Sequence, residues 1–156
     1  AEPTLDGTGS VRIDVAAIGQ LEPVAAASCW RAWNAATLGY LAGVAARALE
    51  LAVEHARARE QFGAPLAALP AVQSRLADAV LAVDGMTLLA WAAATNTGGL
   101  QAPELRFAGG SCCEVTAAAH QVYGAAGFAL ETGLHVYHRR AQSTRAWASA
   151  VCTAAR

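Results

Sequence analysis

The chain has 156 residues, and its 11 basic and 12 acidic side chains give a formal net charge of −1 at pH 7. This balance excludes the strongly basic face that a nucleic-acid-binding protein presents to phosphates. Arg47 and Asp78 interrupt the two longest apolar stretches, and residues 1–3 lack the pattern of a signal peptide, so we expect a cytoplasmic chain without a membrane span.

Residues 1–23 differ in composition from the rest of the chain. They hold three glycines, two prolines and the only convincing alternation of apolar and polar side chains, from Val11 to Val15. Apolar residues at every second position predict a short strand with one buried face. Because a single strand is not stable alone, we interpret residues 1–23 as the tail of a β-domain or a linker, and residues 24–156 as a separate helical domain.

After this segment the apolar side chains recur at three- and four-residue steps, which is the spacing of amphipathic helices. The pattern, with its Gly and Pro breakers, predicts four helices over about residues 24–62, 70–95, 103–123 and 131–155. The first should end near Gly63 and Pro65, because Gly permits a C-terminal cap and Pro cannot continue a helix. Within it, Glu54 and Arg57 are spaced to form an ion pair.

Four long helices joined by short loops predict an all-α fold, an antiparallel up-and-down four-helix bundle with a short extended remnant at its N-terminus. Alanine accounts for 41 residues, so the 55% hydrophobic content overstates the number of large core side chains. Alanines let helices approach closely but bury little area, and we therefore expect the bundle to be buried against further subunits.

Several reactive residue types have a simpler interpretation as core or surface. The cysteines lack the C-x-x-C spacing of zinc sites, and the Glu-x-x-His spacing of di-iron bundles does not occur. Glu131, His135 and His138 could share a helical face. Arg139 and Arg140 beside them would repel a cation, so we expect a solvated or anion-facing surface there. Core positions are expected for Cys29, Cys112, Cys113, Cys152, Trp30, Trp33, Trp91 and Trp147, and core or surface roles for His55 and His120.

Two segments are not explained by a bundle core. Residues 57–65 read Arg-Ala-Arg-Glu-Gln-Phe-Gly-Ala-Pro at the end of the first helix, where a cation also favours the helix dipole. Residues 121–128 read Gln-Val-Tyr-Gly-Ala-Ala-Gly-Phe and leave the third helix through a turn that contains glycines. Backbone N–H groups exposed at such a turn bind anions such as phosphate.

In this order and spacing the two segments resemble the acyl-CoA dehydrogenase family. The R-x-Q-F-G sequence that begins at Arg59, with Pro65 two positions after it, resembles the motif at the end of the first helix of the family's C-terminal domain. Residues 72–78 resemble the start of the next helix. Residues 121–128, followed by the Arg-Arg-Ala of residues 139–141, resemble the family's Q-x-x-G-G-x-G-[FY] turn and the Arg segment after it.

The resemblance implies a flavoenzyme that desaturates acyl-CoA thioesters at the α,β carbons, in tetramers built from dimers. In the family the C-terminal bundle reaches across a subunit interface and holds a neighbour's FAD. Arg59 then matches an arginine on the FAD pyrophosphate, where charge-assisted hydrogen bonds form. The implied cofactor-binding residues are Arg59, Gln61, Phe62 and Leu66 in the first segment, and Gln121 and Gly124 in the second.

The chain departs from the family where a carboxylate would remove the α-proton of the thioester. Counting on from Arg139, Ala148 occupies the usual position of the catalytic Glu. Counting back from Arg59, Trp33 occupies the alternative position on the first helix, and Asn34 replaces the Arg that normally follows. A general base typically contributes about 10²–10⁴-fold in rate, so we expect no catalytic residue in this chain.

A chain that keeps the FAD-binding residues and lacks the base fits a non-catalytic subunit of a heteromeric acyl-CoA dehydrogenase. It would complete a partner's flavin site, with the acyl-CoA substrate bound at the partner's site. The family's N-terminal domain and most of its middle domain have no counterpart here, so we expect a fragment or one part of a split assembly. Two alternatives stay open: a conventional dehydrogenase with a displaced base at Glu131, Glu104 or Glu22, and a flavin-free bundle used only for assembly.

Overall fold

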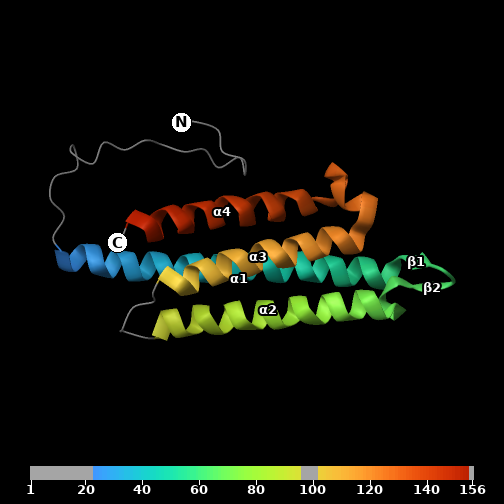
Figure 1. Cartoon of the computed structure of the whole chain (residues 1–156), viewed down its shortest axis with the longest axis horizontal. Helices are drawn as coiled ribbons and strands as arrows, with labels where there is room; N and C mark the ends of the chain where they lie inside the picture. Colours follow the sequence, from blue (N-terminus) through green and yellow to red (C-terminus); the bar gives the residue numbers. More distant parts are fainter. Residues whose placement is uncertain (1–22, 96–101, 155–156) are drawn as a thin grey trace.

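The computed structural model describes residues 23–95 and 102–154, which form four helices packed along one axis (Figure 1). The helices are α1 (Pro23–Ala58), α2 (Pro70–Thr95), α3 (Ala102–Tyr123) and α4 (Leu134–Ala154). Successive helices run in opposite directions, so α1 and α3 point the same way. The predicted all-α, up-and-down bundle is confirmed, while the strand predicted from Val11 to Val15 lies outside the described residues.

The first helix is shorter than the sequence predicts, and a hairpin follows it. α1 ends at Ala58, before the predicted stop, and β1 (Glu60–Gln61) pairs antiparallel with β2 (Ala64–Pro65). The reason lies in the two residues between the strands, since φ is 57° at Phe62 and 80° at Gly63. An α-helix does not accommodate positive φ, so the chain reverses here instead of continuing.

The other helix boundaries lie within three residues of the predicted ones. Three short 3-10 segments connect the helices: η2 (Leu66–Ala68), η3 (Gly124–Phe128) and η4 (Leu130–Thr132). Glu131 therefore lies in η4 and not on α4. The cause is Gly133, whose φ of 65° turns the chain before α4 begins.

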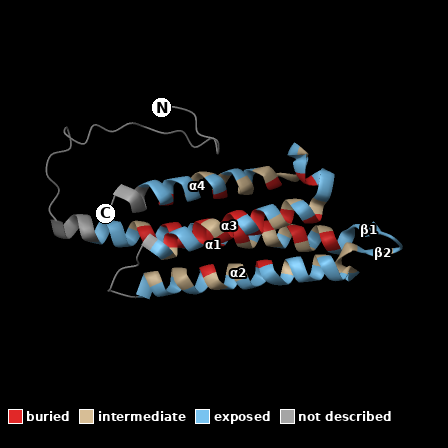
Figure 2. Cartoon of the chain, viewed as in Figure 1, coloured by how far each residue is buried: buried red, intermediate tan, exposed pale blue. Residues whose placement is uncertain are grey.

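The core lies where α1 meets the other three helices. Its fully buried residues recur at helical spacing: Leu38, Leu41, Ala45, Ala48, Ala52 and Ala56. Met86 from α2, Leu105 from α3 and Leu134 from α4 complete the two buried clusters along this stripe. In contrast, most of α2 is exposed (Figure 2), so an apolar helix remains largely open on its outer side.

Alanine-rich contacts also decide which large side chains stay outside the core. Trp30, Trp91 and Trp147 are exposed and Trp33 is half-buried, so the prediction that the tryptophans form the core is wrong for the first three. Helices that meet through alanines lie too close together to accommodate an indole between them.

The cysteines divide between core and surface. Cys112 and Cys113 are buried in α3, as predicted, and burial raises the pKa of the Cys112 thiol to about 12. Cys29 is exposed, contrary to prediction, because the first part of α1 extends beyond the other helices (Figure 1). The side chain of Cys152 lies outside the described residues.

The ion pair predicted within α1 forms with a different partner. Glu54 lies 3.6 Å from Nη1 of Arg47, which is also 2.9 Å from Glu50, and no ion pair joins Glu54 to Arg57 in the described part of the chain. Arg47 is seven residues before Glu54 and therefore on the same face of the helix. All three side chains are exposed, so the network contributes little to stability.

Two helices are long and apolar enough, by length and composition alone, to cross a membrane: residues 28–58 within α1, and α2. The core helix of a water-soluble bundle has the same length and composition, so this is weak evidence for a span. α1 is such a core helix, whereas α2 exposes Leu81, Leu88 and Trp91 on its outer face. That further subunits cover this face stays a prediction.

We expect Leu41→Ala to lower the free energy of unfolding by about 2–5 kcal/mol, because Leu41 is fully buried and its removal leaves a cavity. Leu88→Ala is the matched control on the exposed face of α2 and should change it by less than about 0.5 kcal/mol. Chemical denaturation followed by circular dichroism measures both. Equal losses in the two variants would contradict the packing described here.

Candidate functional site

Both segments that the sequence singles out lie at one end of the bundle (Figure 1). α1 and α3 run in the same direction and finish there. α1 leads into the hairpin segment, residues 59–66, and the last turn of α3 leads into the turn segment, residues 121–128. The fold therefore juxtaposes two stretches that are about 60 residues apart in the sequence.

The hairpin segment holds an apolar ring in a strained and exposed position. Phe62 and Gly63 both have positive φ, as the two central residues of a type I′ turn require. A side chain with a Cβ atom pays about 1–2 kcal/mol for this left-handed conformation. The Phe62 side chain is nevertheless 91% exposed, so it contributes almost nothing to the core in return. Strain and exposure together indicate a surface shaped for binding.

Arg59 combines a fixed backbone with a free side chain. Its N–H donates to the carbonyl oxygen of His55 at 2.9 Å, and its own carbonyl accepts from the N–H of Leu66 at 2.8 Å. The guanidinium is exposed, and no hydrogen bond or ion pair joins it to another residue within the described ranges. An anchored arginine with all its donors available is suited to a phosphate or carboxylate ligand.

The remaining predicted residues of the hairpin segment have two different environments. Gln61 is exposed on β1. Leu66 is half-buried, because it packs against the buried cluster of Ala52, Ala56 and Val122. The side chains of Arg59, Gln61 and Phe62 are thus open to a ligand, whereas Leu66 is shared between the surface and the core.

The turn segment depends on two glycines for different reasons. Gly124 has φ of 60° and open space where a Cβ would lie, which lets the chain leave α3 and exposes the backbone. At Gly127, a Cβ would lie 3.0 Å from Cβ of Tyr123 and 3.1 Å from the carbonyl oxygen of His120, so the turn packs closely on α3. Gln121 is exposed beside it, and Phe128 projects from its end with 79% of its surface exposed.

The two positions where the family would carry a base lie toward the end of the bundle opposite the hairpin segment and the turn segment. Trp33 is half-buried and stacks on Trp30 with ring centroids 5.3 Å apart. Ala148 is 1% exposed and belongs to the buried cluster against which Trp33 packs. Trp33 also lines a cavity of about 320 Å³ between α1 and α4, together with Trp147. Both base positions therefore lie at the same hydrophobic cluster, and neither an indole nor a methyl group accepts a proton.

The base positions and the hairpin segment are too far apart to act on the same cofactor. Trp33 and Arg59 are separated by 26 residues along α1. At the rise of an α-helix this is about 39 Å, which is longer than an extended dinucleotide. A cofactor that contacts Arg59 therefore cannot also place its reacting ring beside Trp33 of the same chain.

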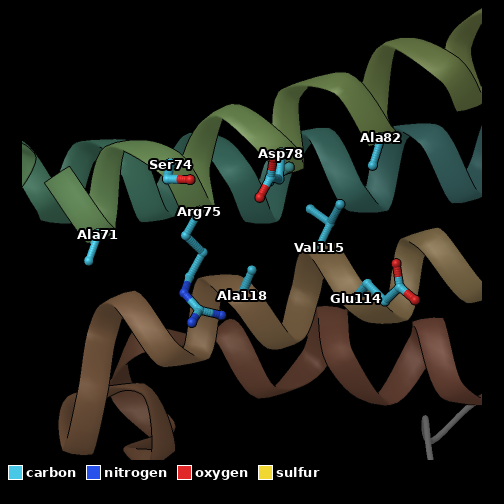
Figure 3. A pocket seen from close by; sticks show the side chains of 9 residues that line it. Ala71, Ser74, Arg75, Asp78, Ala82, Glu114, Val115 and Ala118 are labelled. Carbon is cyan, nitrogen blue, oxygen red and sulfur yellow. The ribbon is translucent and has the colours of Figure 1, made fainter.

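A further hollow of about 430 Å³ lies between α2 and α3 (Figure 3). Arg75 extends from α2 toward Ala118, while Asp78 and Glu114 face the same space from the two helices. No ion pair joins Arg75 to either carboxylate in the described part of the chain. None of the cofactor-binding residues predicted from the sequence lines this hollow.

His138 of α4 contacts α3. Nδ1 of His138 lies 3.0 Å from the hydroxyl of Thr116, and burial, followed by the nearby His120, lowers the pKa of His138. Glu131 does not share a helix with His135 and His138, because it lies in η4. Among residues 28–95 and 103–150 there is no group of three or more metal-binding side chains.

Sequence reasoning missed a contact that links the two segments. The rings of His55 and Tyr123 stack with centroids 4.0 Å apart and an interplanar angle of 17°. His55 precedes Arg59 by one helical turn, and Tyr123 directly precedes Gly124. The sequence showed that each ring lies next to one of the two segments. Helical periodicity, however, gave no indication that the two rings would meet.

The family model described as "Acyl-CoA dehydrogenase, C-terminal domain" matches residues 32–148. The 3-sulfinopropanoyl-CoA desulfinase of Paraburkholderia xenovorans is 32% identical over 118 residues, which are 69% of this chain and 30% of that protein. The chain spans less than a third of the length of the curated relatives it matches.

Solved structures show the same similarity. The FAD complex of PigA matches with a TM-score of 0.60 and 25% identity, over 67% of this chain and 29% of that chain. The ChsE4-ChsE5 complex from Mycobacterium tuberculosis matches with a TM-score of 0.58 and 26% identity, over 74% of this chain and 33% of that chain. Structural relatives of the bundle therefore bind FAD and form complexes.

We expect Phe62→Asn to raise the free energy of unfolding by about 1 kcal/mol, because Asn tolerates the left-handed conformation and the exposed ring adds no packing. Phe62→Ala is the matched control: it removes the ring but keeps the strain, so it should change stability little. Chemical denaturation measures both. A loss of stability in the Asn variant would show that the ring is needed by the fold.

Proposed function

This chain belongs to the acyl-CoA dehydrogenase family, as a C-terminal helical domain, and from this we propose that it supplies the FAD-binding bundle of an FAD-dependent acyl-CoA dehydrogenase. In this role it contacts, across a subunit interface, an FAD held mainly by a partner subunit. That assembly desaturates acyl-CoA thioesters at the α,β carbons, and it works in the cytoplasm. The chain itself lacks the catalytic Glu.

One observation carries this function: Arg59 and Phe62, three residues apart in the hairpin segment, both have exposed side chains at the end of the bundle opposite the base positions, and Phe62 is held in a strained conformation. A guanidinium matches the geometry of a pyrophosphate, and a hydrogen bond to a charged group contributes about 1.5–3 kcal/mol. An exposed aromatic ring in the same segment offers a stacking surface for adenine. These two groups fit the pyrophosphate and the adenine of an adenine dinucleotide.

The turn segment fits the same ligand. Gly124 exposes backbone polar groups without a Cβ in the way, and Gln121 adds an amide that both donates and accepts hydrogen bonds. We assign to these residues the other part of the dinucleotide. When bound, FAD supplies the hydride acceptor, and the residues of this chain hold and orient it. The similarity to the FAD complex of PigA supports FAD as the cofactor.

A partner subunit is needed for the chemistry as well as for the cofactor. Desaturation requires a base for the α-proton, and Ala148 and Trp33 cannot provide one. We therefore assign proton removal and the binding of the acyl-CoA to a partner subunit, which is homologous to this chain but carries the base. The similarity to the ChsE4-ChsE5 complex supports such a heteromeric assembly.

A second candidate, a dehydrogenase with a displaced base, is favoured by one feature of Glu104. Its Oε2 atom is buried without a hydrogen-bond partner. Glu104 begins α3 at the end of the bundle where the base positions lie, and the adjacent Leu105 belongs to the same buried cluster as Ala148. The other two carboxylates considered are weaker candidates, since Glu131 lies at the hairpin end and Glu22 is outside the described residues.

We expect Arg59→Ala to weaken FAD binding about 10- to 150-fold in the purified assembly, because it removes charge-assisted hydrogen bonds to the pyrophosphate. Arg57→Ala is the matched control, since Arg57 is also an exposed arginine and lies in the last turn of α1, two residues before Arg59. Flavin absorbance after dialysis measures retention. Equal retention by the Arg59 variant and the parent assembly would reject the proposed FAD-binding role, whereas a parent assembly without flavin would favour the flavin-free bundle.

Glu104→Gln tests the displaced base, because it keeps the size of the side chain and removes its ability to take a proton. We expect the desaturation rate of the assembly to stay within about a factor of two, since the base lies on the partner. A displaced base predicts a fall of about 10²–10⁴-fold instead. A fall of that size, with normal flavin content, would overturn the non-catalytic assignment.

A further inference from the structure

We propose that the stacked rings of His55 and Tyr123 are a positioning pair, which holds the hairpin segment and the turn segment at a fixed separation so that both contact one dinucleotide. The inference rests on the proposed function. It concerns how the two segments are held in place, whereas the proposed function concerns which residues touch the cofactor.

The need for such a pair follows from the architecture. The two segments leave different helices and have no strand pairing between them. Helix ends open more readily than helix centres, and a ligand held at two points binds well only when the two points keep their spacing. A contact between the last turns of α1 and α3 therefore determines how well the site is pre-organised.

The rings of His55 and Tyr123 form such a contact between the last turns of α1 and α3. The imidazole of His55 and the ring of Tyr123 lie nearly parallel, 17° apart in orientation and with centroids separated by 4.0 Å. The hydroxyl of Tyr123 also donates to the carbonyl oxygen of Leu51 at 3.2 Å, one helical turn before His55. Tyr123 is thus fixed to α1 by both its face and its tip.

Each ring is connected directly to one of the segments. The carbonyl of His55 accepts from the N–H of Arg59 at 2.9 Å, and the carbonyl of Arg59 accepts from the N–H of Leu66 at 2.8 Å. On the other side, Tyr123 is the last residue of α3 and is followed by Gly124, with φ of 60°. A continuous series of contacts therefore runs from the hairpin segment through the two rings to the turn segment.

The electrostatics favour an uncharged pair. Burial, followed by the positive charge of Arg59, lowers the pKa of His55, so the imidazole is neutral near pH 7. Burial also raises the pKa of Tyr123, so its hydroxyl keeps the proton that it donates to Leu51. A neutral His55 leaves Arg59 as the cation that faces a phosphate.

Two substitutions at His55 separate stacking from packing in the flavin-loaded assembly. His55→Leu fills the space without an aromatic face and should weaken FAD binding about two- to tenfold, the range that an aromatic pair contributes. His55→Phe restores the stack and should restore binding. Binding in the Leu variant equal to that of the parent would overturn the proposal, and so would a Phe variant as weak as the Leu variant.

Tyr123 provides the second half of the test. Tyr123→Leu should weaken FAD binding at least as much as His55→Leu, because it also removes the hydrogen bond to Leu51. Adding His55→Leu to Tyr123→Leu should weaken binding little further, because either substitution alone abolishes the stack. Additive losses would mean that the two rings act independently and would overturn the proposal. Trp91→Ala is the control for loss of an exposed aromatic ring, since Trp91 lies on α2 away from both segments.

The two proposals fail in different ways. If Arg59→Ala leaves FAD binding unchanged, the proposed function fails. If Arg59→Ala weakens binding and His55→Leu does not, only the positioning pair is rejected. Thermal unfolding of each variant, recorded by circular dichroism, shows whether the variant is folded at the temperature at which FAD binding is measured.

Discussion

The close approach of α1 to α3 is the contact on which the rest of the molecule depends. Ala48, Ala52 and Ala56 of α1 and Ala119 of α3 are buried in one cluster, where larger side chains would push the helices apart. Because the two helices run in the same direction, this contact brings their last turns to one end. The same proximity leaves the tryptophans at the surface and reduces the area that the bundle buries.

The two ends of the bundle therefore have different chemistry. At one end, Arg59 and Phe62 present a cation and an aromatic ring that the fold itself does not use. At the other end, Trp33 and Ala148 occupy the positions where the family would carry a carboxylate, and Trp33 lines a cavity there. About 39 Å of helix separates them. This separation supports the proposed role, in which the chain binds a cofactor for a neighbour and carries no base of its own.

Strain at Phe62 is consistent with this division. A two-residue turn of this type favours Asn or Gly at that position, and Phe62 has neither the conformational freedom of Gly nor a place in the core. Residues held in such conformations are concentrated at functional sites, where the surrounding structure maintains them. Here the hydrogen bonds at Arg59 and the short β-pairing maintain the turn.

Helical periodicity and the Gly and Pro breakers determined the four helices, and motif order determined the family, because both are local in sequence. The structure showed two local features that periodicity did not predict, namely the hairpin formed through the positive φ of Phe62 and Gly63 and the pairing of Arg47 with Glu54 within α1. Tertiary structure alone decided the exposure of three tryptophans and the stack of His55 on Tyr123. These last two features depend on how closely helices distant in sequence approach each other, which alanine spacing permits but does not specify.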